Sequence, residues 1–167
     1  MAVTRLEVTA REPYWGGQSF GDTGPYEKVS GRLHFAVDPG HVANAPIADL
    51  SLAPRDADGM VNFSAGFRLL QPADPSRGNR NLLSYVVNRG RQVIPFNRPA
   101  PEVDPSETLD PGDGFLMRRG WTVAWCGWQW DVIDDPMLVG LEAPIAFNAD
   151  GRSEEHTSEL QSRETIS

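Results

Sequence analysis

The chain has 167 residues and carries 15 basic against 23 acidic side chains, a formal net charge of −8 at pH 7. This acidic balance, without a stripe of Lys and Arg, argues against nucleic acid as a partner, because phosphates need basic groups to neutralise them. The single cysteine, Cys126, excludes an internal disulfide and a multi-cysteine zinc site. The first residues contain no apolar run long enough for a signal-peptide core or a membrane span. We therefore expect no membrane partner and a cytoplasmic location.

The first 71 residues mostly alternate apolar and polar side chains between turns, which is typical of half-exposed antiparallel strands. Strands are predicted near residues 3–8, at 26–37, at 47–52 and at 60–70. In the last of these, the expected shared face consists of Val61, Phe63, Ala65, Phe67 and Leu69.

Beyond the loop at 72–79 the pattern changes to nearly continuous apolar runs. Residues 82–87 (LLSYVV) and 121–127 (WTVAWCG) predict strands buried on both faces. Between them, residues 113–119 predict a short helix with Asp113 as N-cap and Gly120 just past its end. This βαβ order predicts that the two strands are parallel. A last strand is expected at 139–147, where Pro144 favours an edge position.

The junction after the first apolar strand is the strongest candidate site, because functional loops lie at the carboxyl ends of parallel strands. Asn88, Arg89, Gly90 and Arg91 occupy this junction, and a glycine there lets the backbone present N–H groups to an anion. The alternative is a structural turn with two solvated arginines.

Four tryptophans cluster around the second apolar strand. Trp121 and Trp125 share a strand face and are expected in the core, whereas Trp128 and Trp130 follow the strand and are candidates for the rim of a pocket. The alternative is that the tryptophans form a platform on which sugars stack.

The order of these runs resembles a known family. LLSYVVNRG followed by GFLMRRGWTVAWCGWQWDV resembles the third strand, oxyanion loop, first helix and fourth strand of α/β-hydrolases. Upstream, FGDTGPYEKVSGRLHFAVDP and LAPRDADGMVNFSAGFRLLQP extend the resemblance to a large bacterial α/β-hydrolase-domain family, over roughly residues 16–147. The resemblance implies an α/β fold, with a β-rich region at 1–76 and the first strands and helix of the α/β-hydrolase core at 77–151.

The same resemblance implies hydrolysis of an ester or related acyl bond in a small-molecule substrate, without a cofactor. The loop from Asn88 to Arg91 would contribute one N–H to an oxyanion hole. This chain has Asn-Arg-Gly where many members have His-Gly-Gly, and Arg89 is alternatively a ligand for a substrate carboxylate.

The catalytic residues themselves are absent from the sequence. No Gly-x-Ser-x-Gly elbow occurs, and Ser19 does not have the glycine spacing that this motif requires. His34, His41 and Cys126 are predicted to be structural residues. The acidic residues Asp131, Asp134 and Asp135 predict a solvated loop rather than a metal site. We therefore expect an incomplete α/β-hydrolase fold that lacks its catalytic half, and an inactive chain.

Residues 152–167 (RSEEHTSELQSRETIS) resemble the in-frame translation of a common indexed sequencing adapter. The alternative is an ordinary polar terminus, since Ser, Thr and Glu favour disorder. We expect this segment to be non-native and disordered, with the authentic sequence ending near residues 150–151.

A second functional hypothesis is a non-catalytic β-sandwich module that binds carbohydrate through its tryptophans. It predicts a self-contained monomer that binds a polysaccharide.

Overall fold

The computed structural model describes residues 2–96, 109–133, 135, 137–148 and 151. The described residues fall into two compact units. The larger lies within residues 5–33 and 64–142, and the smaller within residues 1–4, 34–63 and 143–167. The predicted tail at 152–167 lies outside the described residues, and the division predicted at residue 76 stays a prediction.

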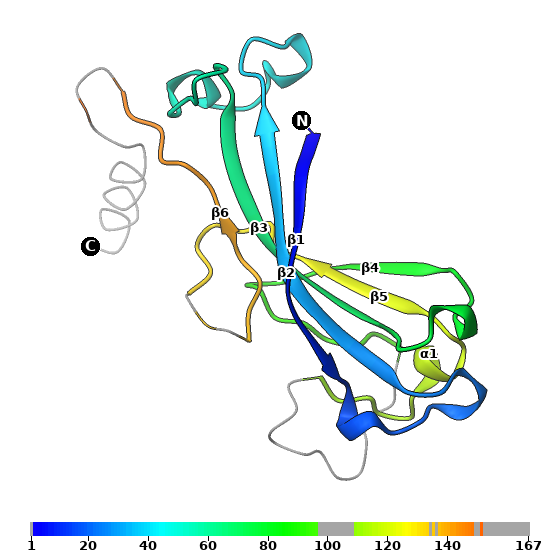
Figure 1. Ribbon diagram of the computed structural model, residues 1–167. Coiled ribbons are helices and arrows are strands. Elements are labelled where there is room, and N and C mark those ends of the chain that lie inside the picture. Colours follow the sequence, from blue (N-terminus) through cyan, green and yellow to red (C-terminus); the bar gives the residue numbers. More distant parts are fainter. Residues whose placement is uncertain (1, 97–108, 134, 136, 149–150, 152–167) are drawn as a thin grey trace, which may run out of the picture. The chain divides into compact units, whose positions relative to one another are not determined.

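The strands form one six-stranded mixed sheet in the order β1-β2-β3-β5-β4, and β6 also pairs with β3 (Figure 1). One short α-helix, α1, precedes β5, and five 3-10 turns lie in the connections. The strands are β1 (Ala2–Pro13), β2 (Tyr26–Val37), β3 (Val61–Pro72), β4 (Leu82–Val86), β5 (Thr122–Cys126) and β6 (Leu141–Glu142); the helix is α1 (Phe115–Arg118); and the 3-10 turns are η1 (Trp15–Gly17), η2 (Gly21–Thr23), η3 (Val42–Asn44), η4 (Leu50–Leu52) and η5 (Pro75–Arg77).

The fold class predicted from the sequence is wrong. Strands make up 39% of the described residues and helical segments only 14%, so the described part of the chain is mostly β and does not have an α/β-hydrolase-like fold. The physical reason is that the one described α-helix has a single turn, which covers little of a sheet. The β-sandwich of the second hypothesis is not found either, because the described strands belong to one sheet.

Several individual elements are nevertheless confirmed. The strand predicted at 26–37 is β2, and those predicted at 60–70, 82–87 and 121–127 are β3, β4 and β5 with shifts of one or two residues. The parallel pairing of β4 and β5 is also confirmed, with Leu83 beside Val123 and Tyr85 beside Trp125.

Two predicted strands differ from the structure. Residues 47–52 form turns ending in η4, and Asp49 before it has the left-handed φ of 56°, which breaks an extended chain. The last strand is only β6, which pairs with β3 at Ser64 and Ala65. The strand predicted at 139–147 is therefore much shorter than expected.

The short helix ends where the sequence predicts, through a glycine. Gly120 has φ 72°; its N–H donates to the carbonyl of Met117 at 3.0 Å, and the N–H of Trp121 donates to Leu116 at 3.2 Å. These two bonds form a Schellman motif. The start differs, because Gly114 holds the N-cap position with φ 67°, although Asp113 Oδ1 accepts the N–H of Phe115 at 3.2 Å.

The main core lies on one face of the sheet in the larger unit. Trp125 and Val123 of β5 and Leu70 of β3 are fully buried there, and Leu83 and Tyr85 of β4 pack against them. The cluster consists of Tyr14, Phe20, Tyr26, Leu70, Val87, Leu109, Leu116, Met117, Val123, Trp125 and Val139. The face predicted to end with Leu69 is not kept at that position: Leu70, which pairs with Val123, is fully buried, whereas Leu69 is only half-buried.

The prediction that the apolar run 82–87 is buried on both faces is wrong. Leu82 is 60% and Val86 72% exposed, and β4 stands at the end of the strand order. On the other face, Leu83 and Tyr85 contact the core. The apolar run 82–87 therefore forms a half-exposed strand, because no described element covers the face that carries Leu82 and Val86.

Candidate functional site

The four residues predicted as an oxyanion loop form a tight turn after β4. The N–H of Arg91 donates to the carbonyl of Asn88 at 3.1 Å, and the two central residues, Arg89 and Gly90, have φ of 51° and 73°. Positive φ at both central positions is typical of a type I′ turn. The turn lies at the carboxyl end of a parallel strand, as predicted.

The turn is bound to the segment that follows β5. The backbone N–H of Arg89 donates to Gln129 Oε1 at 2.7 Å, and the Arg89 guanidinium forms an ion pair with Asp131. The N–H groups of Arg89 and Arg91 therefore already have acceptors within the chain. These contacts agree with the alternative prediction, in which residues 88–91 form a structural turn. The role of these residues in an oxyanion hole stays a prediction.

Gly90 allows a close approach that no other residue would. A Cβ at this position would lie 2.8 Å from Val132 Cγ1 and 2.9 Å from the carbonyl oxygen of Val139. The N–H of Val139 donates to the Gly90 carbonyl at 3.1 Å. The turn is thereby packed against residues 132–139, which limits how far it can move.

A buried amide joins this turn to the sheet. Gln92 donates to the carbonyls of Gly90 and Met137 at 3.2 and 3.0 Å, and its Oε1 accepts from Arg68 Nη1 at 2.6 Å. Burial lowers the pKa of the Arg68 guanidinium, and the charges of Glu12 and Asp135 oppose this shift. Since an arginine stays protonated in proteins, Arg68 places a fixed positive charge behind the turn.

The two predicted rim tryptophans are both exposed but differ in their contacts. Trp128 is 55% exposed, and its indole Nε1 donates to the carbonyl of Val87 at 2.5 Å. Trp130 is 60% exposed and lines a cavity of about 400 Å³, which we call the Trp130 cavity. Its lining consists of Arg32, Gly66, Trp130, Val132, Ile133, Asp135, Leu138, Gly140, Leu141 and Glu142.

One wall of the Trp130 cavity is polar. Arg32 of β2 donates to Ser64 Oγ at 2.6 Å and forms an ion pair with Glu142 of β6. Ser64 Oγ donates in turn to Glu142 Oε2 at 3.1 Å. Because these groups fix one another, the cavity presents a positioned guanidinium and carboxylate beside an indole and aliphatic side chains. The cavity therefore combines polar and apolar lining of similar extent.

Glycines allow the segment behind the cavity to lie close to the sheet. A Cβ on Gly127 would lie 2.1 Å from the carbonyl oxygen of Gly140. The N–H of Gly127 donates to the Gly66 carbonyl at 2.8 Å, and the N–H of Gly66 donates to the Gly140 carbonyl at 2.9 Å. The cavity floor is therefore held by backbone hydrogen bonds.

The other polar residues singled out in the sequence lie outside the turn and the Trp130 cavity or have a structural role. Burial raises the pKa of the Cys126 thiol, which disfavours a nucleophilic thiolate. His34 lies within β2, the Nδ1 of His41 accepts the N–H of Ala43 at 3.1 Å, and Ser19 forms an isolated bridge with Pro25. Asp134 lies outside the described residues, among which no group of three His, Cys, Asp or Glu residues is arranged to hold a metal ion.

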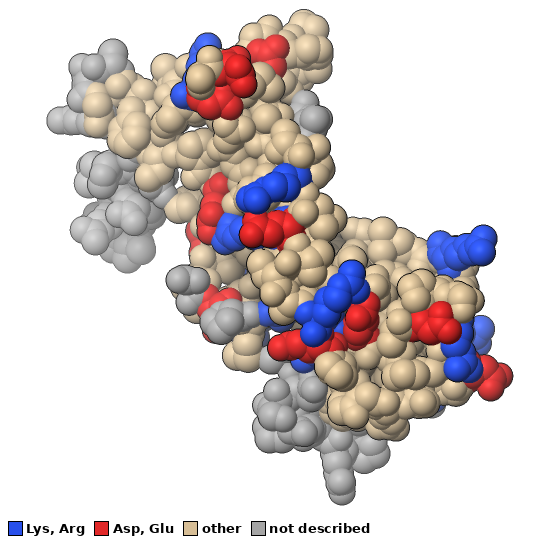
Figure 2. Space-filling model, viewed as in Figure 1, with Lys and Arg blue, Asp and Glu red and all other residues tan. Residues whose placement is uncertain are grey.

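Charges on the face shown in Figure 2 are mixed, with Lys and Arg beside Asp and Glu rather than gathered into a basic stripe. Among the described residues, Arg11 forms an ion pair with Glu27 at 2.6 Å and Arg5 forms one with Glu7 at 2.9 Å. No helix within the described part of the chain is long and apolar enough to cross a membrane.

Sequence reasoning missed four polar residues around the turn and the cavity. Arg32 and Glu142 lie far apart in the sequence and meet only because β2 and β6 both pair with β3. Gln92 meets Arg68 of β3, and Gln129 lies between the two tryptophans in the sequence. No local signal marks the first two, because each is one charged residue in an alternating or irregular stretch.

Neither the family models, nor the curated proteins, nor the solved structures contain a match to this chain.

Proposed function

We propose that this chain is the non-catalytic, substrate-binding part of an enzyme that hydrolyses ester or related acyl bonds, and that the substrate occupies the Trp130 cavity. The observation that carries the proposal is the position of this cavity. Its lining comes largely from the segment that follows the carboxyl end of β5, beside the turn that follows β4. β4 and β5 are parallel, and ligand sites of open α/β sheets lie at the same end of such strands.

The chemistry of the cavity suits a small ester. Trp130, Val132 and Leu138 offer an apolar surface for an acyl or alkyl group, and Arg32 offers donors for a carbonyl or carboxylate oxygen. The acyl-bond class itself rests on the ordered resemblance of the sequence to the hydrolase family. The chain supplies no Gly-x-Ser-x-Gly nucleophile, so its own contribution is binding and not bond cleavage.

A direct binding measurement tests this proposal. Calorimetric titration with ethyl acetate, ethyl butyrate and butyrate is expected to show binding of at least one of them, weakened about tenfold or more by Trp130→Ala. Trp128→Ala is the matched control, because Trp128 is equally exposed but does not line the cavity. Hydrolysis of p-nitrophenyl butyrate should not exceed the buffer rate. Absence of binding at millimolar ester, or hydrolysis that a serine-directed inhibitor abolishes, would overturn the proposal.

A second candidate is binding of a neutral saccharide, favoured by the exposed indole of Trp130 beside the Arg32 and Glu142 pair. Sugars stack on exposed aromatic faces, and paired charged side chains can hydrogen-bond to hydroxyls. The same titration with cellotetraose and maltotetraose separates the two functions. Saccharide binding that Trp130→Ala removes, without ester binding, would select this candidate.

A further inference from the structure

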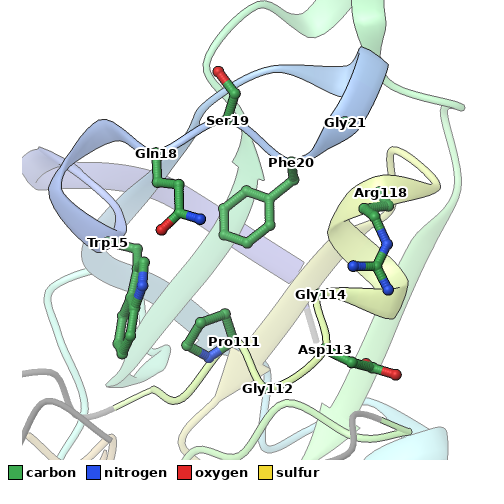
Figure 3. Close-up of a pocket in the computed structure, with 10 residues that line it drawn as sticks. All are labelled: Trp15, Gln18, Ser19, Phe20, Gly21, Pro111, Gly112, Asp113, Gly114 and Arg118. Atoms are coloured by element: carbon green, nitrogen blue, oxygen red, sulfur yellow. The ribbon is translucent and has the colours of Figure 1, made fainter. Parts of the chain in front are cut away.

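A second cavity lies in the larger unit and shares no residue with the Trp130 cavity. Its volume is about 260 Å³, enough for roughly nine water-sized groups, so it suits a fragment rather than a drug-sized molecule. We call it the Trp15 cavity. Figure 3 shows that its walls come from the chain after β1 and from the chain leading into α1, with side chains of Trp15, Gln18, Phe20, Pro111, Asp113 and Arg118.

The apolar part of the Trp15 cavity is rigid. Phe20 is buried, stacks on Tyr14 with ring centroids 5.9 Å apart, and meets Tyr26 edge-on at 5.6 Å. A Cβ on Gly114 would come within 3.0 Å of Phe20 Cδ1, so glycine there keeps the wall close. The aromatic floor is thus fixed by the core.

Trp15 is held beside this floor by a strained turn. Its φ is 49°, in the left-handed region that a bulky side chain rarely adopts, and Gly16 and Gly17 continue the turn with φ of 60° and 78°. Strain of this kind in non-glycine residues recurs at ligand and active sites. The turn places the indole in the cavity wall (Figure 3).

Arg118 provides the charged group. Its guanidinium forms no ion pair with an acidic side chain of the described residues. Asp113 also lines the cavity, but its Oδ1 accepts the N–H of Phe115, and Figure 3 shows the carboxylate directed outward. In the same view Gln18 directs its amide between Trp15 and Phe20, and Arg118 lies across the cavity from Trp15.

We propose that the Trp15 cavity binds a small aromatic carboxylate, with its ring against Phe20 and its carboxylate on Arg118. Aromatic rings favour stacked or edge-on contacts of this kind. A guanidinium presents a fork of donors that matches a carboxylate. The Gln18 amide supplies a further donor at the centre of the cavity. This site is independent of the function proposed for the Trp130 cavity.

Three probes test the recognition on the unmodified chain. Phenylacetate has both the ring and the charge, phenylacetamide keeps the ring without the charge, and acetate keeps the charge without the ring. Calorimetric titration should show phenylacetate binding at least tenfold more tightly than either of the others. Equal affinity for phenylacetate and phenylacetamide, or no binding of phenylacetate at millimolar concentration, would overturn the proposal.

Two variants assign the binding to this cavity. Arg118→Gln should weaken phenylacetate binding about tenfold or more and leave phenylacetamide binding unchanged. Arg119→Gln is the matched control, because the neighbouring Arg119 stacks on Phe115 at 4.6 Å and does not line the cavity. Equal loss in both variants, with unchanged unfolding midpoints, would contradict the site. The three probes decide the matter if Arg118→Gln does not fold.

Discussion

β4 and β5 are neighbouring parallel strands of five residues with similar apolar sequences, LLSYV and TVAWC, yet they occupy different environments. β5 lies between β3 and β4 and buries Val123 and Trp125 completely. β4 stands at the end of the strand order and leaves Leu82 and Val86 largely exposed. Burial therefore follows from the position in the sheet, because the same apolar pattern is compatible with a central or an edge strand.

The largest expected effect lies on β5. Trp125→Ala removes a fully buried ring and the hydrogen bond from its Nε1 to the carbonyl of Val93 at 3.0 Å. We expect the free energy of unfolding to fall by about 3–5 kcal/mol. On β4, Val86→Ala should cost less than about 0.5 kcal/mol, because its side chain is already in water. Urea unfolding of both variants measures the contrast, and equal losses would contradict the assigned positions.

The next effect concerns the turn that leads from α1 into β5. A Cβ on Gly120 would lie 2.9 Å from the backbone nitrogen of Asn79, whose N–H donates to the Gly120 carbonyl at 2.9 Å. Gly120→Ala should therefore cost about 2–3 kcal/mol through left-handed strain and crowding together. Gly17→Ala, with φ 78° but no atom near its added Cβ, should cost only about 1–2 kcal/mol. Thermal unfolding would refute the crowding argument if the two losses matched.

The next expected effect depends on pH. It concerns Tyr26 of β2, whose hydroxyl contacts the residue just before β5. Tyr26 donates its hydroxyl towards the carbonyls of Met117 at 3.1 Å and Trp121 at 3.0 Å, and burial raises the pKa of its phenol. The unfolded chain loses this proton near pH 10, and the folded chain keeps it. Stability is therefore full below about pH 10 and falls as the pH rises above it.

Tyr26→Phe should cost about 1 kcal/mol at pH 7, where two carbonyls lose a donor, and should flatten the decline above pH 10. Urea midpoints measured from pH 8 to 11 would test this. An unchanged slope in the variant would show that the Tyr26 phenol does not govern the alkaline loss.

The smallest expected effect on stability is on β4, at the end of the strand order. Val86→Lys should change the free energy of unfolding by less than about 0.5 kcal/mol, because the residue is exposed. It should nevertheless reduce self-association, because a lysine on an edge strand opposes pairing with another chain. Light scattering at increasing protein concentration measures this, with Asn62→Lys on β3 as a charge-matched control at another exposed position. Equal reduction in both would contradict an effect specific to the edge strand.

The local elements could be predicted from the sequence. Period-two alternation located β2 and β3, and the glycine after α1 located the turn into β5. The parallel pairing of β4 and β5 also followed, because a helix between two apolar runs implies a crossover connection. The candidate turn at 88–91 and the exposure of Trp128 and Trp130 were likewise predictable, since both positions directly follow apolar strands.

The fold class, the exposed face of β4 and the residues that meet in each cavity could not be predicted from the sequence, because they depend on long-range packing. Hydrophobic pattern gives the period of an element but not the number of faces that other elements cover. Arg32 meets Ser64 and Glu142, and Trp15 shares a cavity with Arg118, because strand pairing and turns bring together residues distant in sequence. Contacts of this kind have no local signature, since their energy depends on where the rest of the chain lies.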